Sequence, residues 1–395
     1  MVHAVDLSLP GLGRCLRVQQ APEVVAALTQ ALPGWPVSIA PARGLAPAIR
    51  LRRTPTGYLQ RSPQLPRGLV LPTPASAVCS LVADLGGDRL ARAPDLLGLH
   101  AASVEVDGRL VLFPESHRAG KSTLAVAFAA AGFRLFGDDV LGLTADGQGF
   151  ALGIAPRLRL PLPETLAPEL SDYAEAHAGP ADARYRFVLP RGEGLAAHGE
   201  SAPLGALVLL ERDDAMAAPE VLALRPGEGL QQLLTQHFAH HTAPEALMAR
   251  LLPLMRRLPC LLLRYAEPLA AVRCLADALR RDTPAPGGAG PARERTALAE
   301  TPPPVEPRRR WAASPGGRVY PLGDELFLID PGGGIHRLNA TGQAVWRLLR
   351  EEPLCGAELG ELLAAHFTAP VAPVTQDVCR WLAQLAQAGL VTAVE

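Results

Sequence analysis

The stretch Arg109-Leu110-Val111-Leu112-Phe113, closely followed by Glu115-Ser116-His117-Arg118-Ala119-Gly120-Lys121-Ser122, predicts the central element of the fold. Residues 109–113 are rich in Val and Leu, which favours a buried strand. Residues 123–131 are mostly Ala with Leu, Val and Phe, which favours a helix. A strand, a turn of small residues that ends in Gly-Lys-Ser, and a helix together have the layout of a phosphate-binding loop.

The chemistry of this turn suits a nucleotide. The first N–H groups of a helix have no intrahelical partner and point at the turn, and the helix dipole adds partial positive charge there. A glycine lets the backbone approach a phosphate, a lysine reaches the β- and γ-phosphates, and a serine hydroxyl ligates Mg²⁺. We therefore predict that ATP is bound by Ser116, His117, Arg118, Ala119, Gly120, Lys121, Ser122 and Thr123.

Lys121 is the only lysine among the 395 residues, and every other long basic side chain is arginine. A compact ammonium suits a phosphate loop better than the planar fork of arginine, so we interpret Lys121 as functional. The alternative is a solvent-exposed lysine at the start of a helix. Glu115 stands where the usual first glycine would be, and His117 and Arg118 are bulky, so we expect a reshaped loop.

Composition bounds the class of protein. A hydrophobic content of 48% allows a sizeable core, and a net charge of −1 gives no overall argument for nucleic acid or membrane as a partner. The six cysteines form no C-x-x-C pair, which favours reduced thiols. We find neither a signal peptide nor a long apolar run, so we expect a cytoplasmic protein without a membrane span. The sequence leaves open whether the chain forms a homo-oligomer.

Proline and glycine divide the chain into four parts. Residues 1–98 predict an accessory α+β region, and residues 99–282 predict the α/β domain of the phosphate loop. Residues 283–317 are rich in Pro and Gly and predict a linker. Residues 318–395 predict a compact third domain. Within the second part, residues 99–106 read as a single strand that the Asp107-Gly108 turn joins to the strand 109–113.

Two adjacent carboxylates, Asp138 and Asp139, follow the short predicted strand 133–136. Carboxylates at the end of a strand, one helix after a phosphate loop, are placed to hold Mg²⁺ or to take a proton. The alternative is an ordinary polar loop.

Arg157 and Arg159 alternate with leucines in the segment 154–161. In an extended segment both arginines point the same way. They could face a phosphate or a peptide substrate, or form a solvated strand face.

Three histidines, His237, His240 and His241, lie in a predicted helix over 227–241. Residues four apart on a helix could hold a metal. Because no third ligand accompanies His237 and His241, we favour surface or core histidines.

Residues 318–395 predict three short strands (319–322, 325–330 and 335–338) followed by three helices. This order indicates a small winged-helix-like unit. It carries no cluster of chemically active residues, which favours a binding module over a catalyst.

The central part resembles a known kinase family. His100, the hairpin, the Gly-Lys-Ser turn and the run Gly132-Phe133-Arg134-Leu135-Phe136-Gly137-Asp138-Asp139 are similar to the HPr kinase/phosphorylase family, most closely to its HPr-kinase-related branch. The resemblance implies an α/β P-loop kinase core. It further implies that Asp138 transfers the proton of a serine hydroxyl, that Asp139 and Ser122 lie near the metal, and that His100 sits beside the catalytic carboxylate.

The C-terminal part resembles the PqqD family. The run Leu338-Asn339-Ala340-Thr341-Gly342-Gln343-Ala344-Val345-Trp346-Arg347-Leu348-Leu349, the later Asp377-Val378, Trp381-Leu382 and Leu385, and Gly389-Leu390-Val391 carry the likeness. Members recognise leader peptides of ribosomally made, modified peptides. The resemblance implies that a leader strand adds to the edge of 335–338 and packs against the third helix. Our candidate contacts are Ile335, His336, Arg337, Arg380 and Gln384.

Together these features predict an ATP- and Mg²⁺-dependent phosphotransferase. A leader bound to the last domain would bring the core peptide to the kinase site, where a Ser or Thr hydroxyl is phosphorylated. Asp138 would accept the hydroxyl proton and Arg157 would steady the transferring group. Two alternatives remain: a non-catalytic nucleotide-binding adaptor that delivers precursor peptides to other enzymes, and a kinase for another protein or a small metabolite.

Overall fold

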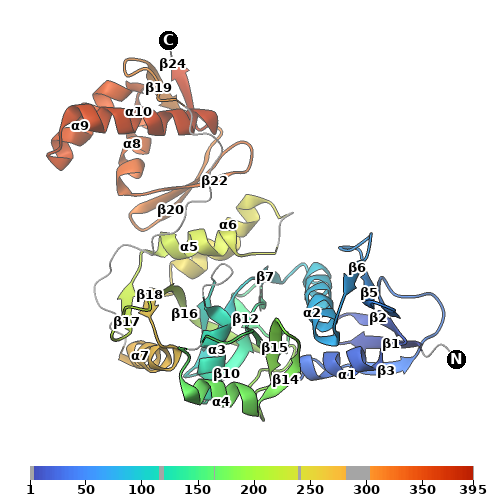
Figure 1. Cartoon of the computed structure of the whole chain (residues 1–395). Helices are drawn as coiled ribbons and strands as arrows, with labels where there is room; N and C mark the ends of the chain where they lie inside the picture. The colour runs from blue at the N-terminus through green and yellow to red at the C-terminus, as the bar shows by residue number, and fades with distance from the viewer. Residues whose placement is uncertain (1–3, 115–119, 164, 239–241, 282–302, 395) are drawn as a thin grey trace. The chain divides into compact units, whose positions relative to one another are not determined.

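The computed structural model describes residues 4–114, 120–163, 165–238, 242–281 and 303–394, and it shows a mixed α/β protein (Figure 1). The chain divides into two compact units. Unit 1 comprises Met1–His240 and Leu258–Pro291, and unit 2 comprises His241–Arg257 and Ala292–Glu395. In the described part of the chain, no helix is both long and apolar enough to cross a bilayer.

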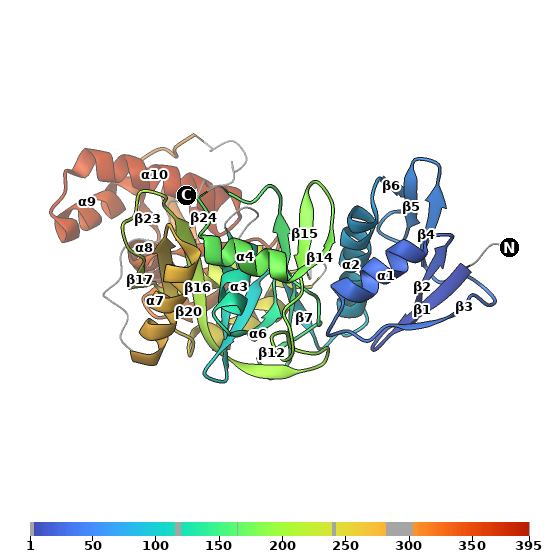
Figure 2. The same cartoon turned by 60° about the horizontal axis from the view of Figure 1, so that its bottom comes forward.

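Unit 1 begins with a six-stranded sheet in the order β3-β1-β2-β4-β5-β6. Helices α1 and α2 cover one face of this sheet (Figure 2). Along β4, Ile49 and Leu51 are buried while Arg50 and Arg52 are exposed, the alternation of a sheet with one face in a core. The elements are β1 (Ala4–Leu9), β2 (Gly13–Gln19), α1 (Pro22–Ala31), β3 (Ser38–Pro41), β4 (Ile49–Thr54), β5 (Gly57–Arg61), β6 (Leu69–Leu71) and α2 (Pro74–Ala91).

A nine-stranded sheet forms the centre of unit 1, with its main path in the order β10-β8-β9-β16-β12-β11-β7, β18 beside β16, and β17 beside β18. Strands β9, β16 and β18 are parallel, so their carboxyl ends lie at one edge. The strands are β7 (Leu97–Leu99), β8 (Ala102–Val106), β9 (Arg109–Phe113), β10 (Arg134–Gly137), β11 (Leu141–Leu143), β12 (Gln148–Phe150), β16 (Ser201–Arg212), β17 (Glu220–Ala223) and β18 (Cys260–Tyr265).

Four helices and a small sheet complete unit 1. The helices are α3 (Lys121–Ala130), α4 (Pro168–Ala176), α5 (Pro226–Thr235) and α7 (Pro268–Arg281). The small sheet has the order β13-β15-β14, with β13 (Arg157–Arg159), β14 (Ala178–Ala181) and β15 (Tyr185–Val188).

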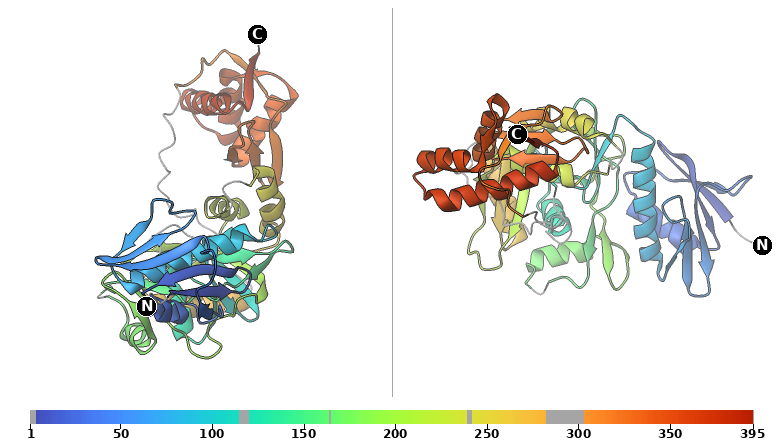
Figure 3. Two further views of the ribbon diagram at one scale, coloured as in Figure 1. Left: turned by 90° about the vertical axis from the view of Figure 1, so that its right-hand side faces the viewer. Right: turned by 90° about the horizontal axis from the view of Figure 1, so that it is seen from above.

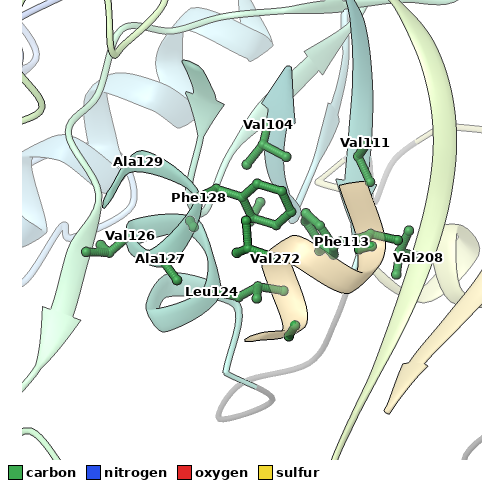
Figure 4. Packing of buried hydrophobic residues seen from close by; sticks show 14 of the residues in the cluster. Val104, Val111, Phe113, Leu124, Val126, Ala127, Phe128, Ala129, Val208 and Val272 are labelled. Carbon is green, nitrogen blue, oxygen red and sulfur yellow. The ribbon is translucent and has the colours of Figure 1, made fainter. Parts of the chain in front are cut away.

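Helix α3 is the buried centre of this unit. After its polar first turn it is apolar on all sides, as expected for a helix enclosed by other elements. Leu124 and Phe128 of α3 pack against Phe113 of β9 and Val272 of α7 (Figure 4). The rings of Phe113 and Phe128 have centroids 5.8 Å apart. This packing fixes the start of α3 beside the end of β9, where the predicted phosphate loop lies.

The described residues of unit 2 form two three-stranded sheets, in the orders β20-β21-β22 and β23-β19-β24, together with four helices. Helices α9 and α10 pack side by side (Figure 3). Trp346, Leu328 and Leu382 are buried in the common core. The elements are α6 (Pro244–Met255), β19 (Arg310–Ala313), β20 (Arg318–Leu322), β21 (Glu325–Ile329), β22 (Ile335–Leu338), α8 (Ala340–Glu351), β23 (Leu354–Cys355), α9 (Gly356–Phe367), α10 (Val371–Gln387) and β24 (Val391–Val394).

The fold of unit 2 is richer than the predicted three strands and three helices. The strands β20, β21 and β22 and the helices α8, α9 and α10 are present in the predicted order. In addition, β19 forms within the predicted linker 283–317, because β23 and β24 pair with its two edges. Arg310 of β19 donates a hydrogen bond of 2.6 Å to the carboxylate of Glu358. Helix α6, which falls inside the predicted domain 99–282, belongs to unit 2.

Two predictions for unit 1 are wrong. Residues 99–106 do not form a single strand, because β7 pairs with β11 whereas β8 pairs with β9. The predicted helix 227–241 ends at Thr235, because the chain turns there and His237 bridges to Leu99. His240 and His241 lie outside the described residues. Among the described residues no group of three His, Cys, Asp or Glu side chains is arranged to hold a metal.

Candidate active site

The Gly-Lys-Ser turn enters α3 with a backbone conformation that requires glycine. Gly120 has φ +90°, and a Cβ atom there would lie 2.6 Å from the hydroxyl oxygen of Tyr265. Tyr265 is buried at the carboxyl end of β18. The sequence analysis missed Tyr265, because 145 positions separate it from Gly120 in the chain. Ser116, His117, Arg118 and Ala119, predicted to contact ATP, lie outside the described residues.

Lys121 is the first residue of α3, and only 7% of its surface is exposed. The alternative of a solvent-exposed lysine is therefore wrong. Its Nζ lies 3.3 Å from Nε2 of His100. Ser122 and Thr123 follow in the first turn of α3, where backbone N–H groups lack intrahelical partners.

His100 occupies the gap between β7 and β8, and both of its ring nitrogens are engaged. Nε2 lies 2.8 Å from Oδ1 of Asp139, and Nδ1 lies 2.8 Å from Oε1 of Gln236. The backbone N–H of His100 also donates to the carbonyl of Gln236, at 2.8 Å. Gln236, which the sequence analysis missed, thus fixes the imidazole through both its main chain and its side chain.

Asp138 follows β10 and is buried, with 6% of its surface exposed. Its Oδ2 accepts a hydrogen bond of 2.9 Å from the backbone N–H of Arg157. Its Oδ1 has no hydrogen-bond partner among the described residues. Burial, and next the negative charge of Asp139, raise the pKa of Asp138 to about 6, although the N–H of Arg157 and the hydroxyl of Ser122 act in the opposite direction.

Asp139 differs from its neighbour, because 53% of its side chain is exposed. Partial burial acts to raise its pKa, but the hydrogen bond from His100 and the charges of His100, Arg157 and Lys121 outweigh burial and lower the pKa. The Arg157 guanidinium lies 3.8 Å from Oδ2 of Asp139. One carboxylate is thus held ionised while the adjacent one takes up a proton near neutral pH, an arrangement that separates acid and base roles.

Arg157 and Arg159 lie on β13 and point the same way, as their alternation with leucines predicted. The guanidinium carbons lie 4.8 Å and 5.9 Å from the centre of the Tyr185 ring. Arg157 is half-buried and reaches Asp139, whereas Arg159 is exposed. Of the two arginines, Arg157 is therefore the one placed at the carboxylates.

The predicted peptide contacts of unit 2 lie on β22 and α10. On β22, the Nε of Arg337 donates to the buried carboxylate of Glu325 at 2.8 Å, and Nε2 of His336 lies 2.7 Å from Oδ2 of Asp330. Ile335 is half-buried beside them. The two remaining candidates are exposed on α10, and they are Arg380, which pairs with Asp377, and Gln384.

Two comparisons with known proteins found similar proteins. Residues 325–391 match the family described as coenzyme PQQ synthesis protein D (PqqD). The PqqD resemblance of unit 2 is confirmed by this match. A solved structure, the Hpr(Ser) kinase/phosphatase from Coxiella burnetii, aligns with 47% of this chain and 99% of its own length, at 14% identity and a TM-score of 0.26. No curated protein matches the chain.

Proposed function

We propose that this chain is an ATP- and Mg²⁺-dependent kinase that phosphorylates a Ser or Thr hydroxyl of a ribosomally made precursor peptide, which unit 2 recruits through its leader. The observation that carries the catalytic part is Asp138. A buried carboxylate with a raised pKa, one of whose oxygens has no hydrogen-bond partner among the described residues, suits a general base that accepts a hydroxyl proton at neutral pH.

The residues around Asp138 fit a nucleotide and its metal. Lys121 and the first N–H groups of α3 supply positive charge for phosphates. The hydroxyl of Ser122 and the ionised carboxylate of Asp139 are oxygen ligands of the kind that Mg²⁺ prefers. When bound, ATP supplies the γ-phosphoryl group and Mg²⁺ neutralises its charge.

The proposed phosphoryl transfer needs few protein groups, and the bonds and the proton are accounted for as follows. A Ser or Thr oxygen of the peptide forms the new bond to phosphorus, the bond between the γ-phosphorus and the bridging oxygen breaks, and ADP leaves. The hydroxyl proton moves to the carboxylate of Asp138. His100, held by Gln236, keeps Asp139 oriented, and Arg157 balances negative charge beside it. Such catalysis is mainly positioning and charge stabilisation.

Unit 2 offers an edge for the leader. Among the described strands β22 pairs only with β21, so its other edge is open to main-chain hydrogen bonds from an added strand. Arg380 and Gln384 lie one turn apart on α10 and are available for side-chain selectivity. Because both units belong to one chain, a bound leader raises the local concentration of the core peptide at the kinase site.

The nucleotide site is tested by calorimetry of MgATP binding to the full chain. Wild type is expected to bind MgATP, Lys121→Ala to lose at least about tenfold in affinity, and Lys121→Arg to recover little because its planar fork cannot replace the ammonium. Equal affinity in wild type and Lys121→Ala would contradict the phosphate-binding role of this turn.

The transfer is tested with γ-labelled ATP and peptides encoded by short reading frames beside the gene. We expect label on a Ser or Thr of such a peptide in the wild type, and none with Asp138→Asn, which keeps the size of the side chain but cannot accept the proton. If MgATP binds and leader peptides bind but no label is transferred, the adaptor function holds and the kinase proposal fails.

A further inference from the structure

The N-terminal region carries an unusual share of positive charge. Residues 1–98 contain ten arginines and five carboxylates, a net charge of +5, whereas the whole chain has a net charge of −1. Between Glu23 and Asp84 there is no acidic residue but six arginines. Such segregation produces a local positive potential even though the whole chain is nearly neutral.

The fold gathers part of this charge on one face of the six-stranded sheet. Helices α1 and α2 cover the opposite face (Figures 1 and 2). Arg50 of β4 lies directly opposite Arg61 of β5, and Arg52 of β4 lies opposite Leu59, which in turn lies opposite Val70 of β6. Residues opposite one another on neighbouring strands share a face. We call these five residues the arginine face.

The three arginines of this face have no internal counter-charge. Within the described part of the chain no carboxylate lies within ion-pair distance of Arg50, Arg52 or Arg61, and all three are exposed. Farther along the same sheet face the fold does supply an acid, because Asp6 bonds both Arg14 and Arg17. Like charges directly opposite one another destabilise a sheet, so the Arg50–Arg61 pair favours an external anion.

The number of arginines on this face and the side chains beside them argue against nucleic acid as the partner. Three arginines neutralise too few phosphates for strong nucleic-acid binding, which depends steeply on the number of phosphates contacted. The described residues of the face include no aromatic ring for stacking bases, because Tyr58 points to the other side and bonds Glu23 of α1.

An acidic peptide fits better. Arg50 and Arg52 are two positions apart on one strand, about 7 Å, and side chains two apart in an extended peptide have the same spacing. Arginine binds carboxylates with paired hydrogen bonds. Beside the guanidinium groups, Leu59 is half-buried and Val70 is 54% exposed, so both can contact the aliphatic parts of such a peptide.

We propose that the arginine face is a docking site for an extended acidic peptide segment of a partner protein, with carboxylates at alternate positions. This site lies on the sheet face opposite α1 and α2, and it is independent of the kinase proposal. It would select a partner by charge without using the nucleotide site.

The test is fluorescence anisotropy with the full chain and a labelled peptide of alternating Glu and Thr. We expect saturable binding that weakens with salt, no binding of the matching Gln-Thr peptide, and at least about tenfold weaker binding by the double variant R50Q/R61Q. The control R273Q/R350Q removes the same charge from exposed positions outside the face and should bind like wild type.

Three results would overturn the proposal: no binding of the acidic peptide, equal binding by R50Q/R61Q and wild type, or tighter arginine-dependent binding of single-stranded DNA or phosphatidylglycerol vesicles than of the peptide. Folding of the variant is checked by its melting temperature. We expect that temperature to stay the same or rise at low salt, because the substitution relieves repulsion between like charges.

Discussion

The opposite environments of Asp138 and Asp139 predict opposite effects of two chemically identical substitutions. The pKa of Asp138 is raised from 3.8 to about 6 by burial and by Asp139, so keeping this group ionised in the folded protein costs free energy. At about 1.4 kcal/mol per pKa unit, a shift of roughly two units costs about 3 kcal/mol at neutral pH. Asp138→Asn removes that cost.

The pH dependence separates this electrostatic effect from packing effects. The folded chain binds more protons at Asp138 than the unfolded chain does between about pH 4 and pH 6, so this group lowers stability as pH rises through that range. The new amide N–H₂ replaces an unpartnered oxygen and costs about 1–3 kcal/mol at every pH. The stability of Asp138→Asn relative to wild type should therefore be about 2.5 kcal/mol more favourable at pH 7.5 than at pH 4.

Asp139→Asn is the matched control with the opposite sign. The pKa of Asp139 is lowered in the fold, so its charge stabilises the folded chain above its unfolded pKa, and that stability is lost as pH falls through the folded pKa. We expect Asp139→Asn to destabilise unit 1 at pH 7.5 and to have less effect at low pH.

The measurement must report on unit 1 alone, since the two units need not unfold together. Hydrogen exchange of peptides from β9 and β16, followed by mass spectrometry in rising urea, gives the free energy of opening of the central sheet. If the difference in the free energy of opening between Asp138→Asn and wild type is the same at pH 7.5 and pH 4, the pKa of Asp138 is not raised. The assignment of Asp138 as the general base then loses its support.

Three further predictions follow from single contacts. Gly120→Ala should destabilise unit 1 by about 1–3 kcal/mol and weaken MgATP binding. Adding Tyr265→Phe to this variant should restore only part of the lost stability, because the φ strain at position 120 remains. Urea unfolding and calorimetry measure both effects, and full restoration would contradict this reasoning. Gln236→Leu should lower kcat at least tenfold with little change in MgATP affinity, because His100 loses the acceptor at Nδ1. Gln236→Glu keeps an acceptor there and should retain more activity. Steady-state kinetics test this, and an unchanged kcat in Gln236→Leu would refute the positioning role. Glu325→Ala should destabilise unit 2 by about 3–5 kcal/mol, because it removes the carboxylate bonded to Arg337, and Glu325→Gln should destabilise it less. Urea unfolding followed by tryptophan fluorescence measures both losses, since three of the four tryptophans lie in unit 2. Equal losses in the two variants would contradict this reasoning.

The sequence correctly predicted those elements whose own residues favour the secondary structure that they adopt. The strand 109–113 and the Ala-rich helix after the Gly-Lys-Ser turn are present, with α3 beginning at Lys121. The Asp107-Gly108 turn joins β8 to β9 as expected. In each case propensity and apolar pattern agree over neighbouring residues, which is the situation where a single sequence is most informative.

Contacts between distant residues could not be predicted in this way. Gln236 is 136 positions from His100, and its role depends on the chain leaving α5 to pair beside β7. The strand β19 was hidden for the same reason, because its partners β23 and β24 come at least 40 positions later. The Pro- and Gly-rich composition of residues 283–317 carries no information about the two strands with which Arg310–Ala313 pairs.

The peptide contacts proposed on β22 illustrate how burial changes a prediction about specificity. The sequence makes Arg337, on the strand 335–338, a candidate contact of the leader peptide. In the fold this guanidinium is bonded to Glu325, whose surface is 0% exposed, and releasing it would break a buried ion pair. Under the proposed function we therefore expect recognition at β22 to depend more on main-chain hydrogen bonds than on the side chain of Arg337. Discrimination among leaders then depends on exposed side chains of α10, among them Arg380 and Gln384, so substitutions there should change which leader binds more than they change the fold of unit 2.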